Sequence, residues 1–320
     1  MAKVITEMND TISWPTGRAV RPWLGPLMII WGGIFIGLAP IGLRFGLSDL
    51  GPQAIGLWRY LFALPILFAI ILLRYRRLPQ RPNIFVVIAG TCFALDIGLW
   101  HWSLTFTSVA NSTFIVNLGN LGVGLIAWAV MRERPKPSWF PAVIIAFVGA
   151  GALSLGGNNL GLETGALAFR GDLLALAAAG FVACYMLVSK LARRSLGGVD
   201  TIFWLTAVEC VVAVFLVYLF NERYFPESLS GFVAPLFLGV FAHVIGQGLI
   251  VTGLGQTPAS VAGILVIVQP VVAAIMSWYL FGELLTGLQI VGCMLILIAI
   301  LLAQSGQTKK INTALVSPND

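Results

Sequence analysis

Three ionisable residues, Arg59, Asp96 and Glu209, lie inside long apolar stretches of this 320-residue chain. A charged side chain at the centre of a bilayer costs about 2.5 to 3.5 kcal/mol, so each one needs a partner or a water-filled cavity. Arg59 and Asp96 lie at a similar depth, about 12 to 14 Å from the same membrane face at about 1.5 Å per residue. We expect them to pair at the border of a binding cavity. The open alternative is that Arg59 extends to the membrane surface and Asp96 bonds a neighbouring hydroxyl.

Glu209 and His243 form a second candidate pair, because each falls near the middle of a later apolar stretch. A carboxylate beside an imidazole in a low-dielectric cavity changes protonation with access to water, which suits proton coupling. Asp96 is a third candidate for that role. The alternative is a histidine bonded to a backbone carbonyl beside a buried, protonated glutamic acid.

Uncharged polar residues recur at helical spacing within the same stretches, and lipid offers such side chains no partner. The polar faces comprise Asp96, Trp100 and Ser103; Thr113, Asn117, Asn120 and Gly124; and Gly239, His243 and Gln247. Gln269 stands beside Pro270, whose missing N–H frees a carbonyl one turn earlier, and Pro40 and Pro65 offer the same. The candidate binding residues are therefore Trp31, Arg59, Asp96, Trp100, Asn117, Asn120, Gln247 and Gln269. Trp31 has a second interpretation as a membrane-interface anchor.

These residues must be positioned by membrane helices. The chain is 58% hydrophobic and only 10% charged, whereas soluble domains carry about 25% charged residues. About 20 apolar residues span a bilayer as a helix, and ten windows approach that length. We place the spans at 24–45, 52–73, 83–105, 108–131, 138–156, 168–190, 200–220, 231–253, 258–281 and 286–304. The expected fold is an all-α membrane protein of ten helices.

The basic residues orient these spans. Of the 19 Lys and Arg residues, only Arg44, Arg170 and Arg223 fall on one face and Arg59 within a span, so all the others share the opposite face. The positive-inside rule makes that face cytoplasmic and places both termini there. Residues 1–23 and 305–320 are then cytoplasmic tails, and the inner (plasma) membrane is the expected location. The net charge of +6 is thus a topology signal, and nucleic-acid binding is not expected.

The two halves of the chain resemble each other. A shift of 150 positions aligns Thr107 with Thr257 and Trp128 with Trp278, and it also aligns Glu133 with Glu283, which we expect to cap helices. A shift of 146 lays Gly25 on Gly171. Five spans are an odd number, so the second copy enters the membrane from the opposite side. We predict two inverted repeats, 24–156 and 168–304, joined by an external linker at 157–167.

Several motifs resemble the EamA-type carriers of the drug/metabolite transporter superfamily. They are Trp31-Gly32-Gly33, the segments 57–65, 96–101 and 107–111, Gln269-Pro270 and the segment 282–286. The resemblance covers roughly residues 24 to 304 and implies two five-helix repeats and export of amino acids or similar metabolites. Asn120 departs from the pattern, because Pro270 stands at the equivalent place in the second repeat. We therefore expect a weaker break in the fourth helix than in the ninth.

The function expected from these features is secondary transport of amino acids or related small metabolites by alternating access. The cavity would be lined by spans one to four and six to nine, with five and ten outside. The runner-up is proton-coupled efflux of hydrophobic cationic drugs, bound by Asp96 or Glu209 against Trp100. A membrane enzyme is a weaker alternative, since the chain has only two histidines and no H-E-x-x-H motif. The expected partners are a small-molecule substrate, the lipid bilayer and a proton gradient, with no cofactor or metal. Glycine-mediated packing is compatible with a monomer or a homodimer.

Overall fold

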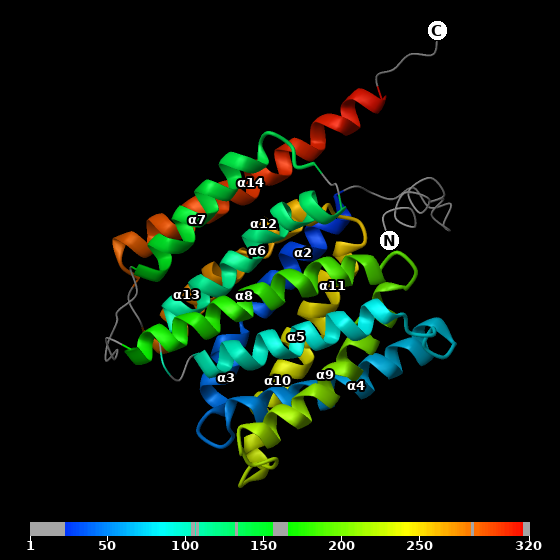
Figure 1. The fold of residues 1–320 in the computed structure, drawn as a ribbon, viewed down its shortest axis with the longest axis vertical. Helices are drawn as coiled ribbons and strands as arrows, with labels where there is room; N and C mark the ends of the chain where they lie inside the picture. Colours follow the sequence, from blue (N-terminus) through cyan, green and yellow to red (C-terminus); the bar gives the residue numbers. More distant parts are fainter. Residues whose placement is uncertain are drawn as a thin grey trace.

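The protein, seen in a computed structural model, is described over residues 23–103, 106, 109–131, 134–155, 166–282 and 285–315. The first half contains α2 (Leu24–Ile36), α3 (Ala39–Gly46), α4 (Pro52–Tyr75), α5 (Ile84–Ser103), α6 (Val109–Met131) and α7 (Trp139–Leu155). The second half contains α8 (Ala166–Ala192), α9 (Gly198–Leu219), η1 (Leu229–Phe232), α10 (Val233–Phe237), η2 (Leu238–Gln247), α11 (Gly248–Leu254), α12 (Ala259–Leu265), α13 (Val268–Phe281) and α14 (Gly287–Leu315). Figure 1 shows that these helices form one elongated bundle.

The helices have the length and composition of membrane spans. Seven segments of the described chain qualify, namely Leu24–Gly46, Pro52–Tyr75, Ile84–Ser103, Phe169–Ala192, Gly198–Leu219, Leu229–Leu254 and Ala259–Leu280. Three further apolar helices are shorter, namely Ile115–Val130, Trp139–Ala152 and Gly287–Ala303. The chain is therefore a multi-pass helical membrane protein. One boundary differs from the expectation, because α14 continues as a helix to Leu315, beyond the span predicted to end at residue 304.

Two spans are interrupted where a proline requires it. Pro40 has no N–H, and its ring would clash with the carbonyl of Ile36, where α2 ends. Pro270 acts in the same way on Val266, in the turn between α12 and α13. The equivalent helix of the first half, α6, carries Asn120 instead and runs unbroken from Val109 to Met131. The prediction of a weaker break in the fourth helix is thus confirmed. Pro65, in contrast, lies inside the continuous helix α4.

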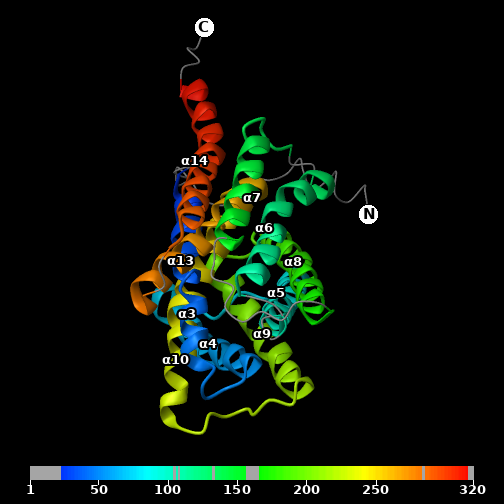
Figure 2. The same ribbon diagram turned by 90° about the vertical axis from the view of Figure 1, so that its left-hand side faces the viewer.

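Packing between the two halves holds the bundle together. Helix α5 packs on α8, α4 and α5 pack on α9, and α2 packs on η2 and α11. Helices α7 and α14 pack on each other. They run along one edge of the bundle in Figure 1, and Figure 2 also shows them side by side. Both helices contribute residues to the hydrophobic core, such as Ala146 and Ala299. No described residue of either helix lines the central cavity, so the prediction that the fifth and tenth spans lie outside the cavity lining is confirmed for the described residues.

The bundle has one end that is rich in arginine, which we call the basic end. The arginines that define it follow α4 and α8 and include Arg76, Arg77, Arg81, Arg193 and Arg194. The Nε atom of Arg193 donates to the carbonyl of Val251, 3.2 Å away, near the end of α11. Gly25, at the start of α2, packs against Gly253 in the same part of α11. Helix α2 therefore begins at the end where α8 finishes, so the first helices of the two halves run in opposite directions.

Close packing of α6 on α8 depends on a glycine. A Cβ atom at Gly119 would lie 2.1 Å from the backbone oxygen of Ala179, whereas nothing lies within 4 Å of one at Gly122. We expect Gly119→Ala to lower the free energy of unfolding by about 1 to 3 kcal/mol, because the backbones must separate. Gly122→Ala is the matched control, and it should be neutral or stabilise by up to about 1 kcal/mol. Thermal unfolding of both variants in detergent measures the difference, and equal melting temperatures would contradict this packing.

Candidate functional site

A cavity of about 110 Å³ lies in the middle of the bundle, between the two halves of the chain. One buried water needs only about 10 to 15 Å³ of such space, so the cavity has room for several waters or a small solute. Its described lining comes from α2 to α6, α8, η2, α11 and α13, with residues between these helices. All of the predicted binding residues except Trp31 line it: Arg59, Asp96, Trp100, Asn117, Asn120, Gln247 and Gln269.

Trp31 is the predicted binding residue that the structure places elsewhere. Its side chain is 51% exposed on the outer surface of α2, and it is absent from the cavity lining. The face of α2 toward the bundle instead contains Pro26, Ile29 and three glycines, and Gly25, Gly32 and Gly33 allow close contact with the second half. A bulky indole has no room on that face. Trp31 therefore points away from the bundle, as its alternative interpretation as an interface residue required.

Arg59 and Asp96 both border the cavity, but they do not form the direct pair that the sequence predicted. Among the residues that the structure describes, no ion pair within 4.0 Å joins them, although both are almost fully buried, at 3% and 4% exposed. The Nε and Nη2 atoms of Arg59 and the Oδ1 atom of Asp96 have no hydrogen-bond partner. Buried charges of this kind are costly unless something else in the cavity pairs with them.

Other polar atoms of the cavity wall are also left without partners. Asn117 donates to the carbonyl of Thr113 at 2.8 Å, and Asn120 donates to Asn117 Oδ1 at 3.1 Å. These bonds leave Asn120 Oδ1 and Thr113 Oγ1 unbonded, and the indole N–H of Trp100 is likewise free of a protein partner. The cavity therefore offers donors and acceptors that converge on one small volume, which is the usual composition of a ligand site.

Sequence reasoning missed the aromatic wall of this cavity. Phe93 and Tyr185 both line it, and their ring centroids lie 4.9 Å apart. The Tyr185 hydroxyl accepts a hydrogen bond from the side-chain amide of Gln247, which joins α8 to η2. Arg59 Cζ lies 6.0 Å from the Phe93 ring centroid, within cation–π range. The available signal was a single tyrosine hydroxyl in the otherwise apolar stretch around Tyr185.

Glu209 and His243 are adjacent, as predicted, but they lie outside the cavity lining. His243 Nε2 is 3.2 Å from Glu209 Oε2 and 2.8 Å from Thr206 Oγ1, and both members of the pair are fully buried. The Thr206 hydroxyl donates to the Ile202 carbonyl at 2.7 Å, so Nε2 of His243 is the donor toward Thr206. Rings separate this pair from the cavity, with Tyr60 at 5.2 Å and Phe93 at 6.1 Å from the imidazole.

His243 also lies in the π-helical segment η2, a second feature that the sequence did not indicate. Insertion of such a segment into a helix turns the residues after it, and π-helical turns are frequent at functional sites. Here Gln247, one turn after His243, lines the cavity, while His243 itself faces Glu209 on α9. One polar stripe predicted from spacing is therefore divided between the cavity and the buried pair.

Three other predicted positions serve packing. Ser103 donates to the Trp100 carbonyl and bonds Ser112, Gly124 packs on the Trp139 ring, and Gly239 packs on the backbone of Arg59. The seventh span was expected to line the cavity, yet no described residue of α9 does so. Helix α9 packs instead on α4 and α5, which carry Arg59 and Phe93 of the lining. Glu133 and Glu283, the predicted caps, lie outside the described residues.

The site is suited to binding. Where the structure describes the chain, no three His, Cys, Asp or Glu side chains gather in a way that would hold a metal ion. The convergent groups are instead two opposite charges, amides and aromatic rings. Such a wall can hold a small polar solute by both ends and enclose its apolar part.

Known proteins resemble this chain in both sequence and fold. Two relatives from Bacillus subtilis (strain 168) are named as uncharacterized transporters. YwfM is 25% identical over 233 residues, which cover 70% of this chain and 74% of YwfM. YyaM is 23% identical over 288 residues, which cover 87% of this chain and 92% of YyaM. A solved structure titled "Crystal structure of protein" superposes with a TM-score of 0.75 at 17% identity, over 87% of this chain and 96% of that one.

The family comparison agrees with the internal repeat. The model of the EamA-like transporter family matches twice, over residues 23–155 and again over residues 169–304. Together these matches include every residue that lines the cavity. They and the two relatives identify a transporter of the drug/metabolite superfamily and not an enzyme. The chain belongs to the EamA-like transporter family.

Proposed function

We propose that this protein is a secondary transporter that exports amino acids or related small metabolites across the inner membrane by alternating access. The observation that carries the proposal is the separation of Arg59 and Asp96 within one cavity. Both side chains are buried, and both have polar atoms without a hydrogen-bond partner in the protein. No ion pair joins them in the described structure, although both line the cavity. A solute with one positive and one negative group would satisfy both charges at once.

The remaining cavity wall fits such a zwitterion. An ammonium group bound to Asp96 would also find the free carbonyl oxygen of Asn120, and a carboxylate bound to Arg59 would find the indole N–H of Trp100. An apolar side chain would pack on Phe93 and on Ile250. The unpaired atoms of Arg59, Asp96, Trp100 and Asn120 then each receive a partner of the opposite character, which supports the substrate class.

The proposed topology is ten spans with both termini in the cytoplasm. Support comes from the three shorter apolar helices, which with the seven longer segments make up that number. The gathering of arginines at one end supports a cytoplasmic basic end. One family model matches both halves of the chain, and the first helices of these halves run in opposite directions. Both observations support inverted repeats. Such repeats can expose a midplane cavity to each side in turn.

Removal of either charge tests the zwitterion assignment. We expect Asp96→Asn and Arg59→Gln each to reduce counterflow of radiolabelled amino acids in proteoliposomes by about ten- to a hundredfold. A hydrogen bond to a charged group contributes about 1.5 to 3 kcal/mol, which corresponds to that range. Glu227→Gln is the matched control, because Glu227 is an exposed carboxylate outside the cavity and should leave counterflow unchanged. If wild-type protein moves none of the 20 common amino acids, the substrate assignment fails.

Efflux of hydrophobic cations is the second candidate function, and one observation favours it: Asp96 and Trp100 lie together on the cavity wall. Arg59 opposes it, because a second positive charge in a small buried cavity repels a cation. Glu209, the other predicted cation ligand, is not part of the lining. Inhibition of amino-acid counterflow separates the two candidates: unlabelled leucine should compete, and tetraphenylphosphonium should not.

We expect proton coupling to depend on the buried pair Glu209–His243 behind the cavity. Glu209 and His243 are in contact, have no access to solvent and touch no cavity space, so they can exchange a proton only when the bundle rearranges. We expect Glu209→Gln and His243→Asn to abolish stimulation of export by a pH gradient while counterflow at equal pH persists. Asp96→Asn, in contrast, should reduce both activities. Stimulation that survives in both of the first two variants would show that the pair only stabilises the fold.

A further inference from the structure

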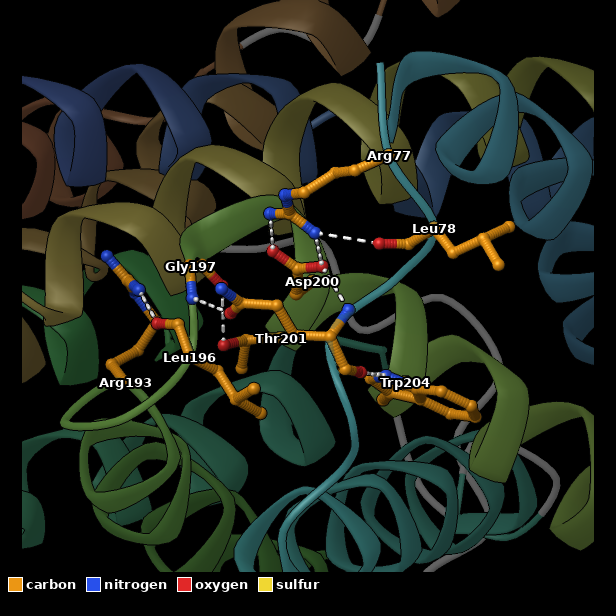
Figure 3. A network of polar contacts seen from close by, with 9 residues as sticks. Arg77, Leu78, Arg193, Leu196, Gly197, Asp200, Thr201 and Trp204 are labelled. Atoms are coloured by element: carbon orange, nitrogen blue, oxygen red, sulfur yellow. Dashed lines mark hydrogen bonds and ion pairs between the residues drawn. The ribbon is translucent and has the colours of Figure 1, made fainter. Parts of the chain in front are cut away.

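A network of polar contacts fastens the two halves together at the basic end (Figure 3). Arg77, just after α4, makes a two-pronged ion pair with Asp200 in the first turn of α9, at 2.8 and 2.6 Å. The backbone N–H of Gln80 donates to the same carboxylate at 2.9 Å, and the Gln80 carbonyl accepts from the Trp204 indole at 2.6 Å. Asn83 donates to Ser195 Oγ at 2.8 Å. We call these four contacts the basic-end latch.

Contacts of the same kind fasten the opposite end. Glu222, just after α9, accepts hydrogen bonds from the backbone N–H groups of Gln53 and Ala54 in the first turn of α4, both at 2.9 Å. The Tyr224 carbonyl accepts from the Trp58 indole at 2.6 Å. Ser228 donates to Asp49 Oδ2 at 3.0 Å. We call these contacts the opposite-end latch.

The two latches are related by the internal repeat. A shift of 146 positions places Gly51 on Gly197 and Trp58 on Trp204, and it places Asp49 on Ser195. Both glycines adopt nearly the same conformation as N-caps, with φ −66° and ψ 156° at Gly51 and φ −61° and ψ 156° at Gly197. Each indole donates to the fifth residue after the end of the partner helix, at the same distance of 2.6 Å.

The backbone of the two latch loops agrees as well. Arg76 and Asn221 are the two non-glycine residues of the described chain with positive φ, at 54° and 53°. They follow α4 and α9 respectively, so each loop turns through the left-handed region at its start. Only the acidic residue differs in position between the two latches. Glu222 lies in the loop after α9 and binds the start of α4, whereas Asp200 lies at the start of α9 and binds the loop after α4. The geometry is thus repeated although most side chains differ.

Elsewhere the two halves differ in shape. The first span breaks between α2 and α3, whereas its equivalent α8 is continuous. Helix α5 is a regular α-helix, but the corresponding segment of the second half contains the π-helical η2. Helix α6 is continuous, and its equivalent breaks between α12 and α13. The symmetric part of the molecule therefore includes α4, α9 and their latches. The asymmetric part is made of the other helices that line the cavity, and α4, through Arg59, is the lining helix that belongs to the symmetric part.

In a carrier with inverted repeats, each half takes up the conformation of the other when access changes sides. A contact that is already the same in both halves is unchanged by that exchange, whereas a contact that differs must be remade. On this basis, which rests on the proposed alternating access, we propose that both latches stay closed throughout transport. They hold α4 and α9 as a fixed frame, and the helices that break or bulge beside the cavity move against it.

In this arrangement the Arg77–Asp200 ion pair is a permanent contact and not a gate. An ion pair that closes one end of a carrier should have an open counterpart at the other end, yet both latches are closed in one and the same structure. The hydrogen bonds that the Arg77 guanidinium donates to the Asp200 carboxylate raise the pKa of Arg77, so this contact stays charged at any physiological pH. Closure at both ends and a constant charge are expected of contacts that stay formed throughout transport.

Cysteine cross-links test whether the latches must open. The pairs Asn83→Cys with Ser195→Cys and Asp49→Cys with Ser228→Cys replace contacting residues of the basic-end and opposite-end latches. The four native cysteines are first changed to alanine, since Cys92 and Cys184 lie 3.2 Å apart and would themselves react. Copper phenanthroline then oxidises each pair to a disulfide, and a maleimide-polyethylene glycol gel shift counts the thiols left free. Ala273→Cys adds a reporter on the cavity wall.

The readout is the rate at which a membrane-impermeant methanethiosulfonate reagent labels the reporter from each side, in right-side-out and inside-out vesicles. We expect both rates to stay within about twofold of the reduced protein, with either latch or both cross-linked. Single-cysteine variants control for the oxidant. A loss of about tenfold or more on one side, restored by dithiothreitol, would make that latch a gate and overturn the proposal. Labelling from one side alone in the reduced protein would instead refute alternating access, and the frame with it, before any cross-link is formed.

Discussion

Two opposite charges that are buried in one cavity and do not neutralise each other impose the main constraint on this structure. In a medium without water, Arg59 and Asp96 are tolerable only if the surrounding protein keeps space between them and lets water or a ligand enter. The cavity is that space. Its walls come from both halves of the chain, so the charges depend on the packing of α5 against α8 and of α2 against η2 and α11.

The same constraint accounts for where the helices break. An unbonded backbone carbonyl is as unfavourable in a bilayer as an unpaired side chain, and irregular backbone is tolerated there only beside a cavity or inside protein. The breaks near Pro40 and Pro270 satisfy this rule, since both prolines border the cavity. Helices α4 and α9 have no such break and take the structural role in the proposed frame, because their ends are fastened by the two latches.

The distinction between the fixed helices and the helices that move beside the cavity also gives a meaning to the position of the buried pair Glu209–His243. Glu209 belongs to α9, in the symmetric part of the bundle, and His243 belongs to η2, in the part that differs between the halves. Their contact at 3.2 Å therefore lies on the boundary along which the proposed motion would take place. A titratable pair on such a boundary would respond to the state of the carrier without touching its substrate.

Local chemistry was enough to predict the helices, because a bilayer of nearly constant thickness requires apolar runs of nearly constant length. The unbroken α6 followed from Asn120 in the same local way, since only proline lacks the N–H. The faces of the helices were decided by tertiary packing. The packing of α2 leaves Trp31 facing outward, and the π-helical geometry of η2 places His243 and Gln247 on different faces. Depth in the membrane predicted that Arg59 and Asp96 would share a level, but only the packed bundle decided that they would face a common cavity without meeting.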